Sequence, residues 1–364
     1  MNDTGGRASA PPRFLIVRLG ALGDVVHAIP AAAAIAAQFP DAEIDWLVDP
    51  RYVDLLGLVR CVRSVVPVDP RGGIGRLGAT IGALRRARYD AVIDLQGLLK
   101  SSVLARLAGA ARTVGFPRSH LREPVARVFY SHTPDPGPAV HVVHKNLALL
   151  TAVGVHDRTV RFPLEIPATA VADEVALRYR AGDGRAGFAL VNPGAGWPNK
   201  RWPAERFGAA AAGVFARAGL RSVVLWGPGE EALAASVVAS SSGAAELAPA
   251  TSILDICALA RRAALMLSGD TGPLHLAAAV GTPVVALFGP TGAERNGPWD
   301  PSDVVVTRTD RCQCLYERRC RRVTGAPVSN MEQAAHAADR QPCIEDIGVD
   351  EVVAAVERRL SGAH

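Results

Sequence analysis

The strongest constraint on the fold is an alternation of short apolar runs, rich in β-branched residues, with longer helical stretches. The first half of the chain carries such runs at residues 13–19, 43–49, 64–69 and 91–96. Helical stretches separate them, among them the Ala-rich residues 24–38. Strands that alternate with helices form a parallel sheet with helices on both faces. This half therefore predicts an α/β domain.

The alternation breaks near residues 156–170, where two prolines and a loss of helical periodicity are typical of a linker. It then starts again, with predicted strands at residues 186–192, 222–227, 265–268 and 283–288. The chain has 364 residues, a length that suits two domains of similar size. We therefore predict two Rossmann-like, doubly wound domains that face a central cleft.

The predicted boundaries place the first domain at residues 13–160 and the second at residues 170–345, followed by a terminal helix at 349–360. In such sheets ligands bind beyond the carboxyl ends of the strands, so the functional residues are expected in the loops that lead from strands to helices.

Positive charge is concentrated in one part of the first domain. The net charge is +5, and residues 100–132 hold one acidic residue, Glu123, against six cations: Lys100, Arg106, Arg112, Arg118, Arg122 and Arg127. A local cationic field favours an anionic partner, such as a phosphate or a membrane surface, although a solvated basic face would look the same. Nucleic acid is the weaker interpretation, because few aromatic residues lie among these cations for base stacking.

No targeting or membrane-spanning segment is predicted. Residues 1–13 are small and polar, and no stretch approaches the roughly 20 apolar residues that a membrane span needs. We expect a cytoplasmic protein that at most rests on the inner face of the cytoplasmic membrane.

Four of the six cysteines lie late in the chain, at Cys312, Cys314, Cys320 and Cys343. Their spacing is not a standard pair of C-x-x-C knuckles, so a structural metal, a disulfide and buried thiols all remain open, with buried thiols favoured in a cytoplasmic protein. Residues 308–345 are predicted to be irregular.

Two strand-to-helix loops of the first half carry candidate chemistry. The first is Gly20-Ala-Leu-Gly-Asp24, whose Asp24 could cap a helix or act as a general base. The second follows the run at 91–96, where Asp94, Gln96 and Gly97 precede Lys100 and suggest a site for a polar group.

Three loops of the second half point to a phosphate-bearing ligand. The loop at residues 192–203 joins glycines to Lys200 and Arg201, which suits a diphosphate. Glu230 follows a strand and could accept hydrogen bonds from a ribose or simply favour a helix N-terminus. The last loop carries Asp270, Thr271 and Gly272 at the start of a helix, a typical place for anion binding.

No Asp-x-Asp pair occurs, so the sequence offers no obvious clamp for a divalent metal on a nucleotide diphosphate. We predict neither a metal site nor a cofactor, and expect Lys200, Arg201 and helix N-termini to meet the diphosphate charge.

The sequence resembles the family 9 glycosyltransferases, the ADP-heptose:lipopolysaccharide heptosyltransferases. The matching segments run from residue 14 to about 291 and read FLIVRLGALGDVVHAIPA, VIDLQGLLKSS, REPVARVFY, NPGAG…NKRWP and SGDTGPLHLAAAVGTPVVALFGPT. The resemblance implies a GT-B fold and an inverting, metal-independent transfer of heptose from ADP-heptose to an anionic inner-core acceptor built of Kdo and heptose.

By motif position, the resemblance implies Asp24 as the catalytic base. It implies that Lys200, Arg201, Glu230, Asp270, Thr271 and Gly272 bind the donor, and that Lys100 and Arg122 bind the acceptor. Two alternatives stay open: another nucleotide-sugar enzyme of the same fold, such as a sugar 2-epimerase, and a non-catalytic nucleotide-sugar binder.

Overall fold

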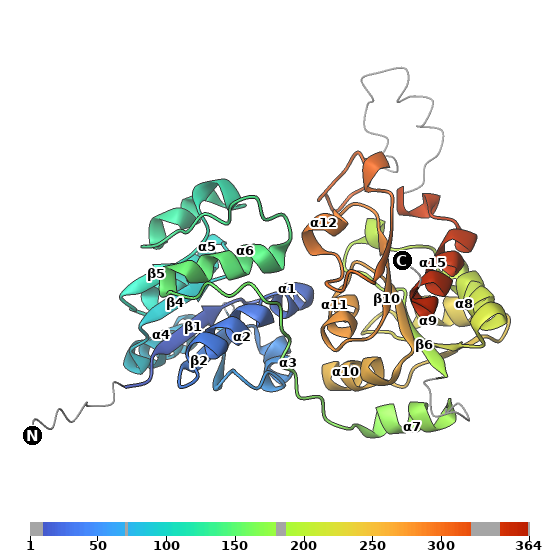
Figure 1. Cartoon of the computed structure of the whole chain (residues 1–364), viewed down its shortest axis with the longest axis horizontal. Coiled ribbons are helices and arrows are strands. Elements are labelled where there is room, and N and C mark those ends of the chain that lie inside the picture. Colours follow the sequence, from blue (N-terminus) through green and yellow to red (C-terminus); the bar gives the residue numbers. More distant parts are fainter. Residues whose placement is uncertain (1–9, 70–71, 180–186, 322–342, 363–364) are drawn as a thin grey trace, which may run out of the picture. The chain divides into compact units, whose positions relative to one another are not determined.

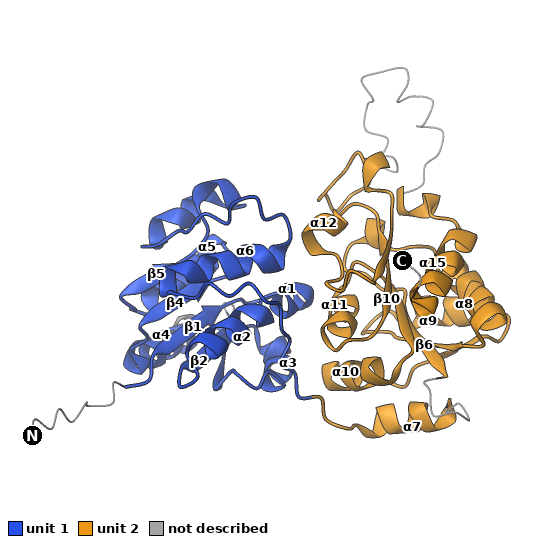
Figure 2. Ribbon diagram, viewed as in Figure 1, with its two compact units in different colours: residues 1–165 blue, residues 166–364 orange. Residues whose placement is uncertain are grey.

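A computed structural model describes residues 10–69, 72–179, 187–321 and 343–362. The chain divides into two compact units, residues 1–165 and residues 166–364 (Figure 2). Each unit is built around one parallel sheet with helices on its faces (Figure 1). The sheets and their helices agree with the predicted pair of doubly wound α/β domains.

Unit 1 contains a five-stranded sheet in the order β3-β2-β1-β4-β5. Its strands are β1 (Arg13–Val17), β2 (Glu43–Val48), β3 (Ser64–Pro67), β4 (Ala91–Asp94) and β5 (Arg112–Val114). Its α-helices are α1 (Leu22–Val26), α2 (Ile29–Gln38), α3 (Val53–Gly57), α4 (Ile74–Ala87), α5 (Leu99–Leu107) and α6 (Val142–Leu149). Its 3-10 turns are η1 (Pro50–Tyr52), η2 (Arg118–His120), η3 (Pro124–Phe129) and η4 (Leu150–Val153).

Unit 2 contains a six-stranded sheet in the order β11-β10-β9-β6-β7-β8. Its strands are β6 (Phe188–Asn192), β7 (Arg221–Val224), β8 (Ala245–Leu247), β9 (Leu265–Gly269), β10 (Val284–Phe288) and β11 (Val304–Thr307). Its α-helices are α7 (Ala170–Arg178), α8 (Ala204–Ala218), α9 (Glu231–Ala239), α10 (Ile253–Arg262), α11 (Gly272–Ala279), α12 (Ala293–Asn296) and α15 (Val349–Ser361). Its 3-10 turns are η5 (Pro198–Lys200), η6 (Thr309–Arg311) and η7 (Cys343–Asp346).

The central strands of unit 2 are buried along their whole length because helices cover the sheet on both sides. Every residue of β6, β9 and β10 is buried. One face packs against α8 and α15, and the other against α7, α10 and α11. This two-sided burial leaves the loops at the carboxyl ends of the strands as the places where polar side chains can gather.

The helix predicted over residues 24–38 is two helices. Helix α1 ends with His27 as its C-cap, and α2 begins at Ile29 with a proline in its first turn. Proline lacks an amide hydrogen and suits the start of a helix, so Pro30 begins a new helix rather than continuing the first. The break leaves Asp24 on a short helix of five residues directly after the loop that follows β1.

Candidate functional site

A pocket of about 280 Å³ opens in unit 2, where loops follow the neighbouring strands β6, β7 and β9. Its lining is Asn192, Gly194, Ala195, Gly196, Trp197, Lys200, Glu230, Asp270, Thr271, Gly272 and Pro273. The structure thus brings together five of the residues expected to bind a donor: Lys200, Glu230, Asp270, Thr271 and Gly272. The sixth, Arg201, is not part of this lining.

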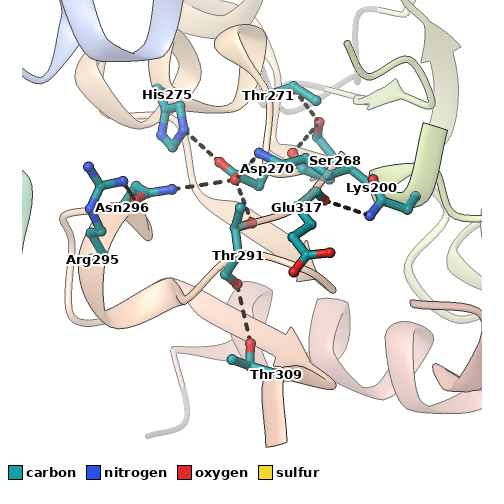
Figure 3. Close-up of polar contacts among 12 residues, drawn as sticks. Lys200, Ser268, Asp270, Thr271, His275, Thr291, Arg295, Asn296, Thr309 and Glu317 are labelled. Carbon is teal, nitrogen blue, oxygen red and sulfur yellow. Dashed lines mark hydrogen bonds and ion pairs between the residues drawn. The ribbon is translucent and has the colours of Figure 1, made fainter. Parts of the chain in front are cut away.

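Asp270 is the buried centre of this site (Figure 3). Its carboxylate accepts hydrogen bonds from Lys200 Nζ at 2.6 Å and from Thr291 Oγ1 at 2.7 Å. His275 Nε2 lies 3.1 Å from the other oxygen, Oδ1, whereas Asn296 Nδ2 lies 3.4 Å from the oxygen that Lys200 and Thr291 contact, Oδ2. A carboxylate that contacts this many donors fixes the orientation of these neighbours, above all Lys200, and can also contact a ligand.

The surroundings of Asp270 keep it ionised. Burial alone would raise the pKa of this carboxyl group, but the hydrogen bond and charge of His275 and the charge of Lys200 outweigh burial and hold the pKa well below its ordinary value. The site therefore holds a carboxylate and an ammonium group as an ion pair, with the Lys200 side chain only 15% exposed.

This lowered pKa predicts acid sensitivity. A carboxyl group with a depressed folded-state pKa stabilises the fold above its unfolded pKa of about 3.9, and this contribution is lost as the pH falls below that value. We expect Asp270→Asn to be less stable than the parent at pH 7 and to lose less stability between pH 7 and pH 3. Urea unfolding at both pH values measures this. Asp350→Asn, at an exposed position in the first turn of α15, is the control; equal acid dependence of Asp270→Asn and the parent contradicts the assignment.

The start of α11 is fixed by a side-chain network between adjacent strands. Asn192 Nδ2, at the end of β6, donates to Thr271 Oγ1 at 3.0 Å and to Ser268 Oγ at 3.1 Å. Thr271 is the N-cap of α11 and Gly272 its first residue. First-turn amides of a helix have no acceptor within the helix, so this end offers N–H donors and a positive dipole end to an anion.

Glu230 closes another side of the pocket. It is the N-cap of α9, and its Oε2 accepts a hydrogen bond from the amide of Gly227 at 3.2 Å. A Cβ atom on Gly194 would collide with this carboxylate, so a larger residue at 194 would displace the Glu230 side chain from its position in the pocket. Arg201 reaches Glu230 at 3.8 Å and donates to the carbonyl oxygen of Ala195, and thus supports the loop from outside the pocket lining.

Trp197 is a pocket residue that the sequence analysis did not single out. Lys200 Nζ lies 4.7 Å from the centre of its indole ring, and the Arg318 guanidinium lies 5.8 Å from it. Two cations over one ring hold positive charge beside the pocket. The sequence could have indicated Trp197 through its position inside the glycine-rich loop. A single tryptophan there does not reveal which cations lie against its ring.

In unit 1, Asp24 is presented to solvent by a buried arginine. Arg18 Nη2 lies 2.6 Å from Asp24 Oδ2, and the amide of Ala21 donates to the same oxygen at 3.3 Å. Arg18 is 8% exposed, whereas the Asp24 side chain is 39% exposed. Arg18 and the Ala21 amide therefore fix the orientation of the carboxylate, and its exposed part is accessible to a ligand.

The loop after β4 supports the loop that carries Asp24. Gln96 Oε1 accepts from the amide of Leu19 at 2.8 Å. Asp94 is fully buried and accepts from Tyr130 Oη at 2.7 Å, from Ser101 Oγ at 2.8 Å and from the amide of Gln96 at 2.8 Å. Burial outweighs these hydrogen bonds and raises the pKa of Asp94. The carboxylate that was interpreted as part of a polar-group site thus holds two loops together inside the unit.

Lys100 and Arg122 lie on the surface of unit 1. The amide of Leu99 donates to Glu123 Oε2 at 2.7 Å, which brings the start of α5 beside the segment that carries Arg122. In the part of the chain that the structure describes, neither Lys100 nor Arg122 forms an ion pair. Both cations are therefore available to an anionic ligand.

Three of the late cysteines, Cys314, Cys320 and Cys343, are buried, and Cys312 is partly buried. The sulfur atoms of Cys312 and Cys314 lie 3.7 Å apart. The hydrogen bond with Cys343 and, after it, burial raise the pKa of Cys312, so this thiol stays protonated at neutral pH. Among the described residues, no three His, Cys, Asp or Glu side chains are arranged to hold a metal ion. Within the same ranges, no helix is long and apolar enough to cross a membrane.

Known proteins resemble this chain over most of its length. The chain is similar to lipopolysaccharide heptosyltransferase 1 of Pseudomonas aeruginosa, with 29% identity over 85% of this chain and 87% of that protein. It is 28% identical to lipopolysaccharide heptosyltransferase 1 of Escherichia coli over 80% of this chain and 92% of that protein. The solved structure of E. coli heptosyltransferase WaaC with ADP superimposes with a TM-score of 0.68 at 27% identity, over 84% of this chain and 96% of that chain.

The family 9 glycosyltransferase of Veillonella parvula superimposes with a TM-score of 0.76 at 22% identity, over 96% of this chain and 97% of that chain, and shows the same fold. The two units thus form a GT-B fold. The sequence model described as glycosyltransferase family 9 (heptosyltransferase) matches residues 77–323, more than half of the chain. This protein therefore belongs to glycosyltransferase family 9, the heptosyltransferase family.

Proposed function

We propose that this glycosyltransferase moves a heptose from ADP-heptose to an anionic inner-core acceptor of lipopolysaccharide, built of Kdo and heptose. Its relatives are named lipopolysaccharide heptosyltransferases, and solved relatives hold ADP and ADP-2-deoxy-2-fluoro heptose. The observation that carries the proposal is the unit 2 pocket, where Lys200, the N-terminus of α11 and Glu230 surround one space.

Each part of the donor has a matching group in this pocket. Lys200 and the amides of Thr271 and Gly272 supply positive charge and N–H donors for the diphosphate. The Glu230 carboxylate accepts hydrogen bonds from the ribose hydroxyls. Asp270 holds the Lys200 ammonium group in place through the 2.6 Å contact, and Arg201 steadies the glycine loop.

The transfer follows from these roles. Asp24 removes the proton from an acceptor hydroxyl, and the oxygen forms a bond to the anomeric carbon of the heptose. The bond from this carbon to the diphosphate oxygen breaks on the opposite face, so the configuration inverts and ADP leaves. Lys200 and the first-turn amides of α11 stabilise the charge on ADP, and we propose that this replaces a metal ion. Lys100 and Arg122 bind the anionic acceptor.

The donor can be identified by thermal stability. A ligand at about 100 times its Kd stabilises the folded state by about 2.7 kcal/mol. We expect ADP-heptose and ADP to raise the Tm, UDP-sugars to leave it unchanged, and EDTA to alter neither the shift nor the rate of transfer. A panel of nucleotide-sugars in a thermal-shift assay tests this. A larger shift with a UDP-sugar, or loss of activity in EDTA, contradicts the proposed donor or the metal-free reaction respectively.

A further inference from the structure

We propose that Arg318 is a further donor-binding residue, and that its guanidinium group binds the diphosphate of the nucleotide-sugar at the unit 2 pocket. Arg318 follows β11 and η6 in the chain and lies outside the pocket lining. The inference rests on the proposed function, because it assigns one more residue to the same donor.

The charged side chains already assigned to the pocket largely neutralise one another. Lys200 is paired with the buried Asp270 carboxylate at 2.6 Å. Glu230 is the remaining charged residue of the lining, and Arg201 faces it at 3.8 Å from outside the lining. The N-terminus of α11 adds only a partial positive charge. A diphosphate carries several negative charges, so an unpaired cation beside this pocket would strengthen its binding.

The indole ring of Trp197 holds Arg318 next to the pocket. Trp197 belongs to the lining, and the centre of its ring lies 4.7 Å from Lys200 Nζ and 5.8 Å from the Arg318 guanidinium carbon. Both cations lie over the same ring, so Arg318 neighbours the ammonium group that we assign to the diphosphate. The planar guanidinium group can donate to two phosphate oxygens at once, a geometry that an ammonium group lacks.

The backbone around Arg318 is held against the pocket loop. Asn199, in η5, donates from its Nδ2 to the carbonyl oxygen of Glu317 at 2.9 Å. The side chains of Cys314 and Cys320 are buried on either side of this contact in the sequence. A cation whose backbone is already in place loses less conformational entropy on binding than a cation on an unattached loop. The Arg318 side chain is therefore positioned for the ligand in advance.

The charge of Arg318 is not taken up by a protein acid. Arg318 is exposed, and within the described residues it forms no ion pair. Glu317, the acid next to it in the sequence, is paired with Arg321 instead. Arg319 is also exposed, but in the part of the chain that the structure describes it has no contact with an aromatic ring. Arg319 is thus a matched control, with the same charge on the same segment.

Calorimetry on the full-length protein with ADP, UDP and adenosine tests the proposal. We expect Arg318→Ala to weaken ADP binding about tenfold and to leave adenosine binding unchanged, because the lost contact is to the diphosphate. Arg318→Lys should recover part of the loss, since it restores the charge without the planar fork. High salt should weaken ADP binding to the parent more than to Arg318→Ala. Arg319→Ala should bind every ligand like the parent.

Two results overturn the proposal. Unchanged affinity of Arg318→Ala for ADP removes Arg318 from the donor site. An equal loss for ADP and adenosine shows that Arg318 supports the Trp197 ring and does not contact the phosphates. If the parent binds UDP more tightly than ADP, the proposed donor is wrong, and the loss that Arg318→Ala shows with UDP then decides the diphosphate contact. The Tm of each variant without ligand confirms that its fold is intact.

Discussion

Asp24→Ala is expected to lower kcat by about 10²- to 10⁴-fold while the affinity for ADP stays close to that of the parent, because a general base contributes about this much to a proton transfer. Asp24 belongs to unit 1, whereas the pocket that we assign to the donor lies wholly in unit 2. A change confined to the base should therefore slow the chemical step and leave donor binding intact. Turnover with saturating donor and acceptor measures the first quantity, and calorimetry with ADP measures the second.

The contact with Arg18 complicates the alanine variant, because the substitution leaves the buried Arg18 guanidinium without the carboxylate 2.6 Å away. Asp24→Asn separates the two effects: its amide oxygen can still accept from Arg18 and Ala21, but it has no basicity. We expect both variants to lose activity and only Asp24→Ala to lose stability as well. Asp54→Ala, an exposed acid in the first turn of α3, is the matched control and should be fully active. Normal turnover of Asp24→Asn would remove Asp24 from the base role.

The sequence predicts strands correctly where both faces of the strand are buried. Strands β6, β9 and β10 are buried at every position, and such strands read as continuous apolar runs. The edge strands β5, β8 and β11 were not predicted. Strands β5 and β8 have only three residues each and include a polar side chain. Short edge strands depend on a neighbouring strand for their hydrogen bonds, and periodicity does not contain that information.

The sequence predicts which residues form the candidate site, but not the hydrogen bonds and ion pairs among them. The loops after parallel strands meet at one edge of a sheet, which is why Lys200, Glu230 and Asp270 converge on one pocket. Their partners are distant in sequence: Lys200 and Asp270 are 70 residues apart, and Asn192 and Thr271 are 79 apart. A polar residue at the end of a strand looks the same in sequence whether it faces a ligand or a neighbouring side chain, as Asp94 demonstrates.

Lys200→Ala is expected to weaken ADP binding by about 10- to 150-fold, since a hydrogen bond to a charged group contributes about 1.5–3 kcal/mol. The same change leaves the buried Asp270 carboxylate without its shortest contact, so the free energy of unfolding should also fall. Weaker binding could then reflect a disturbed pocket rather than a lost diphosphate contact. Calorimetry with ADP and urea unfolding must therefore be measured on the same variants.

The two effects separate in a pair of variants. In Lys200→Met/Asp270→Asn neither the cation nor the carboxylate remains, so no charge is left unpaired in the pocket. We expect much of the lost stability to return in this double variant, while ADP affinity stays low because the positive charge is still missing. Lys100→Ala, which removes an exposed cation from unit 1, should leave ADP affinity unchanged. If ADP affinity recovers together with stability in the double variant, Lys200 supports the pocket through Asp270 and does not contact the diphosphate.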